Sequence, residues 1–294
     1  ISYKFRYITE CDMCKCPSTR FKMVGRRMDR SQGKNPRRKP ALITSIQKCM
    51  NCGLIFSNPQ PLPINIQDHY GVEPAEYWNE SYFKPDIIGN NARVLKATRY
   101  GGQNGKILDI GIGVGFAMKA MLDAGLDVIG VEPSEEFCDY AIKKTGIPES
   151  RIVRSSIENA KFQNDYFDYI NMGAVLEHLA SPSESLKQAL QYVKKGGKIE
   201  IEVPNSSWTV NKIFNLFYKF TFQPFVANIS PMHPPYHLFE FDLKSFKLNG
   251  VINNYKVVDH HYFVGPTYLP SFLNSVLRKF MEKTKTGMQL IVVI

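Results

Sequence analysis

An apolar run that ends in a glycine-rich turn places the strongest constraint on the fold of this chain. Lys106–Ile110 has the composition of a buried strand, and Gly111, Gly113 and Gly115 follow it at alternate positions before a helix-length segment. Glycines let such a turn approach a ligand closely, and the start of a helix presents free amide groups. The segment therefore predicts a strand-turn-helix unit with a ligand site at the carboxyl end of the strand.

The alternation of strand and helix continues along the chain. Expected strands are 106–110, 127–131, 151–153, 168–172 and 198–203, and expected helices are 115–124, 134–144 and 183–194. A helix near 242–250, a strand near 255–264 and a final strand over Met288–Ile294 follow. Apolar strands joined by helix-length crossovers form a parallel sheet. The chain is thus predicted to be an α/β protein with a Rossmann-like sheet.

Acidic residues at the ends of two successive strands indicate the kind of ligand. Asp109 precedes the first glycine by two residues, and Glu132 ends the next strand, where an acidic side chain can accept both hydroxyls of a ribose. A carboxylate at Asp109 would repel a pyrophosphate but suits a cation, and the glycine spacing differs from the dinucleotide motif. S-adenosylmethionine, which is cationic and carries a ribose without phosphates, fits these residues. The alternative is a capping role for Asp109 and a surface position for Glu132.

Four cysteines near the N-terminus predict a metal site. Cys11 with Cys14 and Cys49 with Cys52 form two CxxC pairs, which can bring four sulfurs to one ion, usually zinc. Such a set leaves no open coordination position, so the zinc would be structural. The 34 residues between Cys14 and Cys49 exceed the usual zinc-ribbon spacing, and Cys16 is a spare thiol that can compete as a ligand. Reduced, buried cysteines without a metal are the alternative.

Positive charge is concentrated in the N-terminal region of a chain whose net charge is +10. The stretch 26–39 holds seven basic residues and one acidic residue, and its glycine and prolines favour a loop. It is either a solvated excursion or a patch for phosphates or an acidic partner. The predicted organisation is a zinc-ribbon-like module over 1–60, a linker and helical segment covering the cofactor site over 61–104, and a cofactor domain over 105–294 with an aromatic lid at 206–241.

Several segments resemble the successive motifs of class I S-adenosylmethionine-dependent methyltransferases. They are Ile107–Phe116, Val128–Pro133, Phe167–Leu179 and Val193–Asn205. The segment from Cys49 to Pro59 resembles the zinc-binding segment that precedes some members, including sugar C-methyltransferases of antibiotic and surface-glycan pathways. The resemblance covers nearly all of 1–205 and implies a seven-stranded sheet whose last strand, Met288–Ile294, is inserted antiparallel.

The resemblance also implies which residues bind the cofactor. Glu132 would hold the ribose hydroxyls, and Ser156 stands where the family usually has an aspartate for adenine, so it would be a weaker acceptor. Ile157 would stack on the base. The methionine and ribose side would be lined by Asp109, Gly111, Gly113 and Gly115, and the floor of the pocket would be formed by Met172 and Gly173.

Histidines in two segments are the candidates for acceptor chemistry. Methyl transfer is largely a problem of positioning, with a base needed when the nucleophile must lose a proton. Tyr236 and His237 in the lid resemble the Tyr/His acid–base pair of the sugar C-methyltransferases, and His178 after the fourth strand is the second candidate. Aromatic packing of the lid and a structural role for His178 are the alternatives.

The predicted function is methylation of a small molecule: a sugar nucleotide, a glycan or a secondary-metabolite intermediate. Methylation of ribosomal or transfer RNA, with the basic N-terminal module on the phosphates, is the first alternative. A non-catalytic binding module that retains the cofactor fold is the second. Ile1–Glu10 lacks the apolar core of a secretory signal, no apolar run could span a membrane, and paired cysteines favour a reducing compartment, so a cytoplasmic protein is expected.

Overall fold

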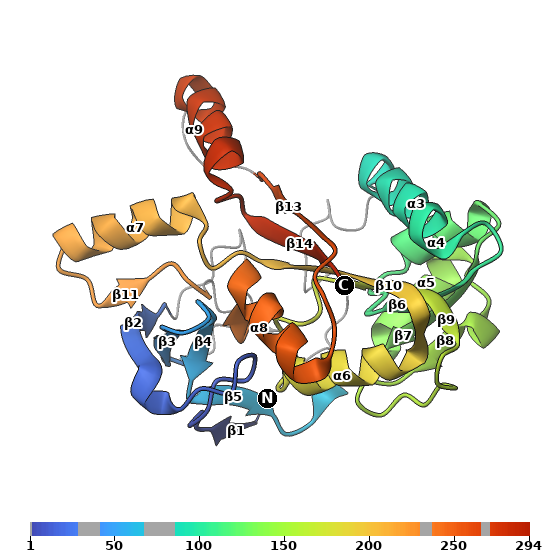
Figure 1. Cartoon of the computed structure of the whole chain (residues 1–294), viewed down its shortest axis with the longest axis horizontal. Coiled ribbons are helices and arrows are strands. Elements are labelled where there is room, and N and C mark those ends of the chain that lie inside the picture. Colours follow the sequence, from blue (N-terminus) through green and yellow to red (C-terminus); the bar gives the residue numbers. More distant parts are fainter. Residues whose placement is uncertain (1, 29–41, 68–85, 230–236, 266–270) are drawn as a thin grey trace. The chain divides into compact units, whose positions relative to one another are not determined.

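The structure, a computed structural model, divides into two compact units (Figure 1). It describes residues 2–28, 42–67, 86–229, 237–265 and 271–294, and only the backbone of 271 and 272. Unit 1 contains Pro63–Val175 and Glu184–Ile201, and unit 2 contains Tyr3–Leu62, Leu176–Ser183 and Glu202–Ile294. The cysteine region and the C-terminal region therefore belong to the same unit.

Seven strands are hydrogen-bonded in the order β13-β14-β10-β9-β6-β7-β8. They are β6 (Lys106–Ile110), β7 (Asp127–Glu132), β8 (Ile152–Arg154), β9 (Phe167–Gly173), β10 (Val193–Pro204), β13 (Asp259–Phe263) and β14 (Gln289–Val293). β6 pairs in parallel with β7 and β9, and β7 pairs in parallel with β8. The final strand lies between β13 and β10 and is antiparallel to β13. The predicted α/β class and the inserted last strand are confirmed.

The helices of unit 1 start where the sequence provides caps. Helix α5 (Glu135–Thr145) begins after Ser134, whose hydroxyl accepts the N–H of Phe137, and Glu135 lies in its positively polarised first turn. Helix α3 (Ile87–Gly101) begins after Asp86, which accepts the N–H of Gly89. Helix α4 (Phe116–Asp123) follows the glycine turn, and α6 (Pro182–Tyr192) leads into β10. A 3-10 turn, Glu149–Arg151, precedes β8.

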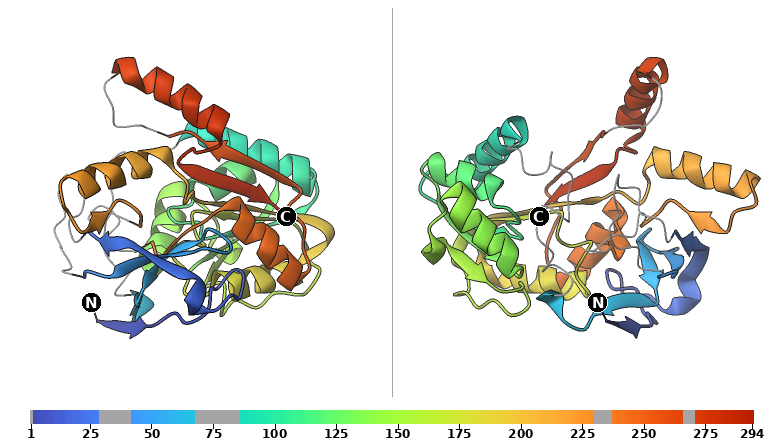
Figure 2. Two further views of the ribbon diagram at one scale, coloured as in Figure 1. Left: turned by 60° about the vertical axis from the view of Figure 1, so that its left-hand side comes forward. Right: turned by 180° about the vertical axis from the view of Figure 1, so that it is seen from behind.

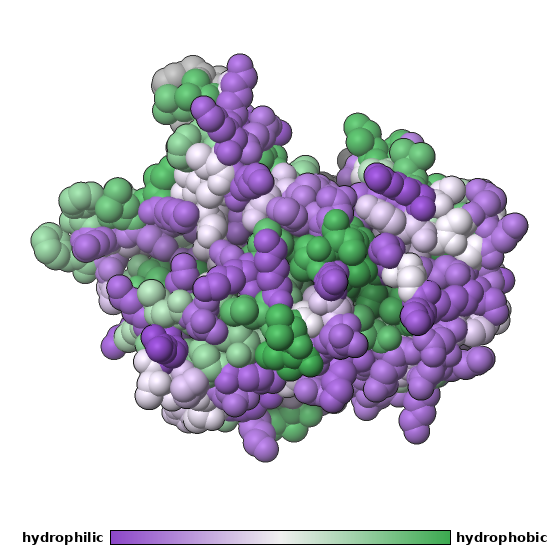
Figure 3. Space-filling view, in the orientation of Figure 1, coloured by the Kyte–Doolittle hydropathy of each residue, from purple (hydrophilic) through white to green (hydrophobic). Residues whose placement is uncertain are grey.

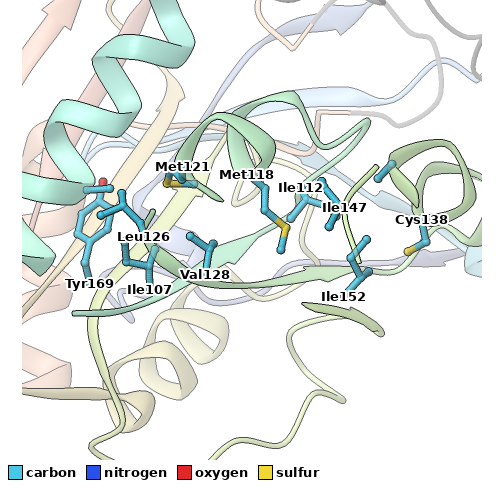
Figure 4. Packing of buried hydrophobic residues seen from close by; sticks show 12 residues of the cluster. Ile107, Ile112, Met118, Met121, Leu126, Val128, Cys138, Ile147, Ile152 and Tyr169 are labelled. Atoms are coloured by element: carbon cyan, nitrogen blue, oxygen red, sulfur yellow. The ribbon is translucent and has the colours of Figure 1, made fainter. Parts of the chain in front are cut away.

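One apolar cluster joins these helices to the parallel strands (Figure 4). Met118 and Met121 of α4 pack with Ile107 of β6 and Val128 of β7, and all four side chains are almost completely buried. Cys138 of α5 belongs to the same cluster and is fully buried, as expected for a small apolar residue. Burial of each such side chain contributes about 1.5–3 kcal/mol, so this cluster holds the ends of β6 and β7 in place.

A second sheet in unit 2 has the strand order β11-β2-β3-β4-β12. The cysteine region supplies β2 (Phe21–Arg27), β3 (Ser45–Cys49) and β4 (Ile55–Asn58), while the segment predicted as a lid supplies β11 (Phe225–Val226) and β12 (Phe239–Glu240). β11 is parallel to β2, and β12 is antiparallel to β4. β1 (Tyr3–Arg6) pairs with β5 (Gln60–Pro63) in a separate two-stranded sheet, and Ser18–Arg20 forms a 3-10 turn. The lid segment thus completes the sheet of the cysteine module.

Two expectations about loops were wrong. Arg26 and Arg27 belong to β2 rather than to a loop over 26–39, and Arg27 is completely buried. The remaining part of that stretch from 29 onward lies outside the described residues. The segment 206–241 was expected to be irregular, but it contains the helix α7 (Thr209–Phe220). Its apolar side chains recur at helical spacing, which the aromatic and proline content concealed in the sequence.

The boundary between α6 and β10 also differs from the prediction. The helix stops at Tyr192, and β10 starts at Val193 and continues through the two glycines to Pro204, whereas the sequence predicted a helix to 194 and a strand over 198–203. Gly196 has a positive φ of 86°, but β10 continues across it.

Unit 2 also contains α8 (Leu243–Asn253) and α9 (Ser271–Thr284), in addition to α7. Figure 2 shows these three helices from two further sides. The buried residues of α7 lie in its first turn, while Phe217 and Phe220 are exposed and Phe222 beyond its end is 95% exposed. This end of α7 forms the green tip at the left of Figure 3. No helix in the described part of the chain has the length and apolarity to cross a membrane.

The glycine turn allows a prediction with a matched control. Gly115 and Gly125 both have a left-handed backbone, with φ of 83° and 80°, but an added Cβ at Gly115 would lie 2.8 Å from Cδ1 of Ile147, whereas nothing lies within 4 Å at Gly125. Gly125→Ala should cost about 1–2 kcal/mol of unfolding free energy through backbone strain alone. Gly115→Ala should lower the unfolding free energy by more, because the added methyl group would also push α4 and α5 apart. Urea denaturation of both variants measures this, and equal losses would contradict it.

Candidate active site

Glu132 ties the glycine turn to the end of β7. Its carboxylate is 4% exposed, Oε2 accepts the N–H of Gly113 at 2.9 Å, and Oε1 accepts the N–H of Ser134 at 3.0 Å. Burial raises the pKa of Glu132 to about 7, although both hydrogen bonds lower it. A carboxylate has about four acceptor sites. Glu132 therefore keeps capacity to accept the hydroxyls of a ligand while it holds the turn.

Asp109 lies beside Glu132 on the neighbouring strand and has a partner that the sequence analysis missed. It is 2% exposed, and Nδ2 of Asn171 donates to its Oδ1 at 2.6 Å. The register of β6 and β9 places Asp109 and Asn171 directly opposite each other. Burial raises the pKa of Asp109, while Asn171 and the charge of Arg93 lower it. The available signal was Asn171 itself, a polar residue between the apolar residues Ile170 and Met172 of β9.

Arg93 of α3 is the second residue that the sequence analysis missed. A Cβ on Gly173 would lie 2.8 Å from Nη1 of Arg93, so the guanidinium lies against the glycine that ends β9. Its charge also lowers the pKa of Asp109. The sequence predicted a helical segment covering this site but gave no reason to select Arg93. The carboxyl group of Asp109 is therefore partly compensated by a cation.

The remaining predicted cofactor residues lie at the same edge of the parallel strands. Met172 is fully buried near the end of β9, and Gly173 is its last residue. Ile157 is 2% exposed in the turn after β8, and the carbonyl of Ser156 accepts the N–H of Asn159 and of Ala160. In parallel α/β sheets, ligands bind at the carboxyl ends of the strands. Unit 1 therefore brings together all of the residues to which the sequence assigned the cofactor.

In unit 2 the two candidate histidines are neighbours. The ring centroids of His178 and His237 are 4.8 Å apart with an interplanar angle of 74°. One potential ligand atom from each histidine and one from Glu177 all lie within 4.8 Å of one another. Tyr236 lies outside the described residues. The structure thus joins His178 and His237, which the sequence treated as separate candidates, into one group.

The four predicted metal-binding cysteines form a single cluster. The sulfurs of Cys11 and Cys52 are 3.6 Å apart, those of Cys14 and Cys49 are 3.7 Å apart, and all four lie within 4.8 Å of one another. Four thiolates around Zn²⁺ with bonds of about 2.3 Å would be separated by roughly 3.8 Å. The donor set and spacing therefore fit zinc. The sulfur of Cys16 lies 3.3 Å from that of Cys49, close enough to compete as predicted.

Comparison with known proteins establishes the family. A model of the methyltransferase domain family matches residues 86–263, which is more than half of the chain. The chain therefore belongs to this family, and it is a class I S-adenosylmethionine-dependent methyltransferase, as its motifs implied. The magnesium protoporphyrin IX methyltransferase of Synechocystis, solved with bound SAH, shares the fold with a TM-score of 0.50 at 11% identity, over 70% of this chain and 81% of that one.

Relatives in sequence match only part of the chain. The ubiquinone biosynthesis O-methyltransferase of Photobacterium profundum is 29% identical over 144 residues, 44% of this chain and 61% of that protein. The tRNA U34 carboxymethyltransferase of Syntrophotalea carbinolica is 31% identical over 104 residues, 34% of this chain and 32% of that protein. An uncharacterized protein of Methanocaldococcus jannaschii is 27% identical over 51% of this chain and 67% of its own length.

The environment of Glu132 predicts how cofactor affinity depends on pH. Its pKa of about 7 means that the carboxylate, which would accept ribose hydroxyls, forms as the pH rises through that value. Affinity for S-adenosylhomocysteine should therefore increase across this range. Glu132→Gln should lose on the order of 2 kcal/mol of binding free energy above pH 7 and should lose the pH dependence. Calorimetry at several pH values measures both.

Glu135→Gln is the matched control, because Glu135 is an exposed residue in the first turn of α5. The affinity of Glu135→Gln for S-adenosylhomocysteine should equal that of the parent at every pH. A Glu132→Gln variant with parental affinity at every pH would remove Glu132 from the cofactor site.

Proposed function

We propose that this protein transfers a methyl group from S-adenosylmethionine to a small-molecule acceptor. The observation that carries the proposal is the group formed by Asp109, Glu132 and the glycine turn. Glu132 retains acceptor capacity for the ribose, while Asp109 suits a ligand whose sulfonium is cationic and which has no phosphates. Arg93 beside Gly173 would be available to the carboxylate of the methionine part.

His178 follows the cofactor residues closely in the chain. It is five positions after Gly173, which is part of the proposed floor of the cofactor pocket, and a chain of that length reaches at most about 18 Å. The acceptor side of the reaction is therefore assigned to the group of His178 and His237. One of these imidazoles would accept a proton from the acceptor or orient it, with His237 as the first choice.

A sugar nucleotide, glycan or secondary-metabolite intermediate is the proposed acceptor. The support is the resemblance of the cysteine segment and of His237 to sugar C-methyltransferases, together with relatives named for ubiquinone biosynthesis, whose acceptors are also small molecules. The second candidate is methylation of RNA, which is favoured by the relative named for tRNA U34 and by the net charge of +10. Burial of Arg27 removes one cation from the stretch that would bind phosphates.

Transfer of a radioactive methyl group distinguishes the two acceptor classes. The protein is incubated with tritiated-methyl S-adenosylmethionine and a cell extract, and the label is then measured separately in the RNA and small-molecule fractions. We expect the label in the small-molecule fraction. Label that enters RNA and is released by ribonuclease would instead establish the second candidate.

The labelled fraction then allows a test of His237. A positioned general base contributes about 10²–10⁴-fold to rate, so His237→Ala should lower turnover by that factor and leave affinity for S-adenosylhomocysteine unchanged. His261→Ala, at an exposed histidine of β13, is the control and should retain the parental rate. Turnover of His237→Ala within a few-fold of the parent would exclude this role.

The cysteine cluster is proposed to hold one structural zinc ion. The ion would join Cys11 and Cys14, which precede β2 in the chain, to Cys49 at the end of β3 and Cys52 in the following turn. The sulfur spacing supports tetrahedral coordination. A closed thiolate set supplies folding energy rather than catalysis.

Elemental analysis tests the zinc site with a matched pair of cysteine variants. The parent should contain one zinc per chain, Cys52→Ser should lose it and melt at a lower temperature, and Cys16→Ser should keep it. Cys16 lies beside the cluster but outside the proposed ligand set, so the comparison separates a true ligand from a nearby thiol. Zinc lost from Cys16→Ser but kept by Cys52→Ser would overturn the ligand assignment.

A further inference from the structure

Glu177, His178 and His237 form a set of potential metal ligands outside the cysteine cluster. The carboxylate and the two imidazoles each contribute one ligand atom, and these atoms lie within 4.8 Å of one another. Carboxylate and imidazole ligands suit divalent first-row transition ions, with bonds of about 2.0–2.2 Å. Donors around such an ion are separated by roughly 3–4 Å. A small movement of the side chains would therefore bring all three onto one cation.

The backbone around these ligands is fixed by hydrogen bonds within unit 2. The carbonyl of Glu177 accepts the N–H of Leu238 at 2.6 Å and, more weakly, that of Phe239 at 3.3 Å. The buried guanidinium of Arg27 donates to the carbonyl of His237 and, through Nε at 2.8 Å, to that of Ile229. His237 is therefore held next to Glu177 by two independent elements, β12 and β2. Such support from surrounding groups is typical of ligand positions in metal sites.

The carboxyl group of Glu177 is buried in an environment that favours a cation. The residue is 2% exposed, and its Oε2 has no hydrogen-bond partner among the described residues. A buried polar atom without a partner is costly and uncommon. A bound cation would satisfy this oxygen and would compensate the charge of the ionised carboxylate.

We propose that Glu177, His178 and His237 bind a divalent transition-metal ion, in addition to the zinc of the cysteine cluster. Three protein ligands leave coordination positions open, as in sites that bind substrate directly. One consequence rests on the proposed function: the ion would chelate two adjacent oxygen atoms of the acceptor, such as neighbouring hydroxyls. His237 would then orient the acceptor through the ion rather than accept its proton. The metal binding itself does not depend on methyl transfer.

Titration of the zinc-loaded full chain with Mn²⁺ tests the proposal. Mn²⁺ prefers carboxylate and imidazole to thiolates, so it reports on this site rather than on the cysteines. Loss of the free Mn²⁺ signal in electron paramagnetic resonance should reveal one site per chain. Glu177→Gln and His178→Asn should each weaken binding by more than the roughly 10–100-fold that loss of a supporting group costs. His261→Asn should bind Mn²⁺ as the parent does.

The unfolding midpoint without Mn²⁺ verifies that each variant is folded, and the isosteric Glu177→Gln change should leave it almost unaltered. Equal Mn²⁺ affinity in Glu177→Gln and the parent would overturn the proposal. So would a parent that binds neither Mn²⁺ up to about 1 mM nor a second equivalent of Zn²⁺. Calorimetry with S-adenosylhomocysteine and the methyl-transfer assay are run on the same samples. If the protein binds S-adenosylhomocysteine and transfers methyl groups but binds neither Mn²⁺ nor a second Zn²⁺, the proposed function stands and the metal site alone is rejected.

Discussion

Buried carboxyl groups near the carboxyl ends of the strands are the constraint on which both candidate sites depend. Asp109 and Glu132 in unit 1 and Glu177 in unit 2 are between 2% and 4% exposed, and burial raises the pKa of each. A carboxyl group without water is tolerated only where donors or cations compensate it. Main-chain amides compensate Glu132, and Asn171 with Arg93 compensates Asp109. These costs make each position selective for ligands that donate hydrogen bonds or carry positive charge.

The cysteine module is built from two distant parts of the chain. β2, β3 and β4 contain or adjoin the cysteine pairs, but β11 and β12 complete their sheet from a segment about 170 residues further on. A module of about 60 residues rarely supplies a sufficient core by itself. Val226 of β11 and Ile229 form a small apolar cluster with Ile46 and Ile55. Long-range strand pairing therefore stabilises this module, and the proposed zinc ion would be a second source of stability.

Arg27 connects this module to the candidate acceptor group. Its completely buried guanidinium donates to the main chain at Ile229 and at His237. Burial raises the pKa of Glu240 to about 7, and the charge of Arg27 partly opposes that rise. A buried cation of this kind requires several fixed acceptors, so it ties β2 to the segment that carries His237. The N-terminal module thus contributes to the position of His237, the candidate acceptor-side residue, independently of the proposed zinc ion.

The sequence by itself predicted the order of strands and helices from 106 to 203, the glycine turn and a set of candidate cofactor residues. Those features are local: apolar periodicity, glycines with positive φ and acidic residues at strand ends are each encoded within a few positions. Only the tertiary structure decided that Arg93 lies against Gly173, that Asn171 is the partner of Asp109 and that Arg27 is buried. It also decided that His178 and His237 belong to one group with Glu177. These contacts join residues far apart in the chain through strand register, helix packing and buried side-chain hydrogen bonds, and no local pattern specifies them.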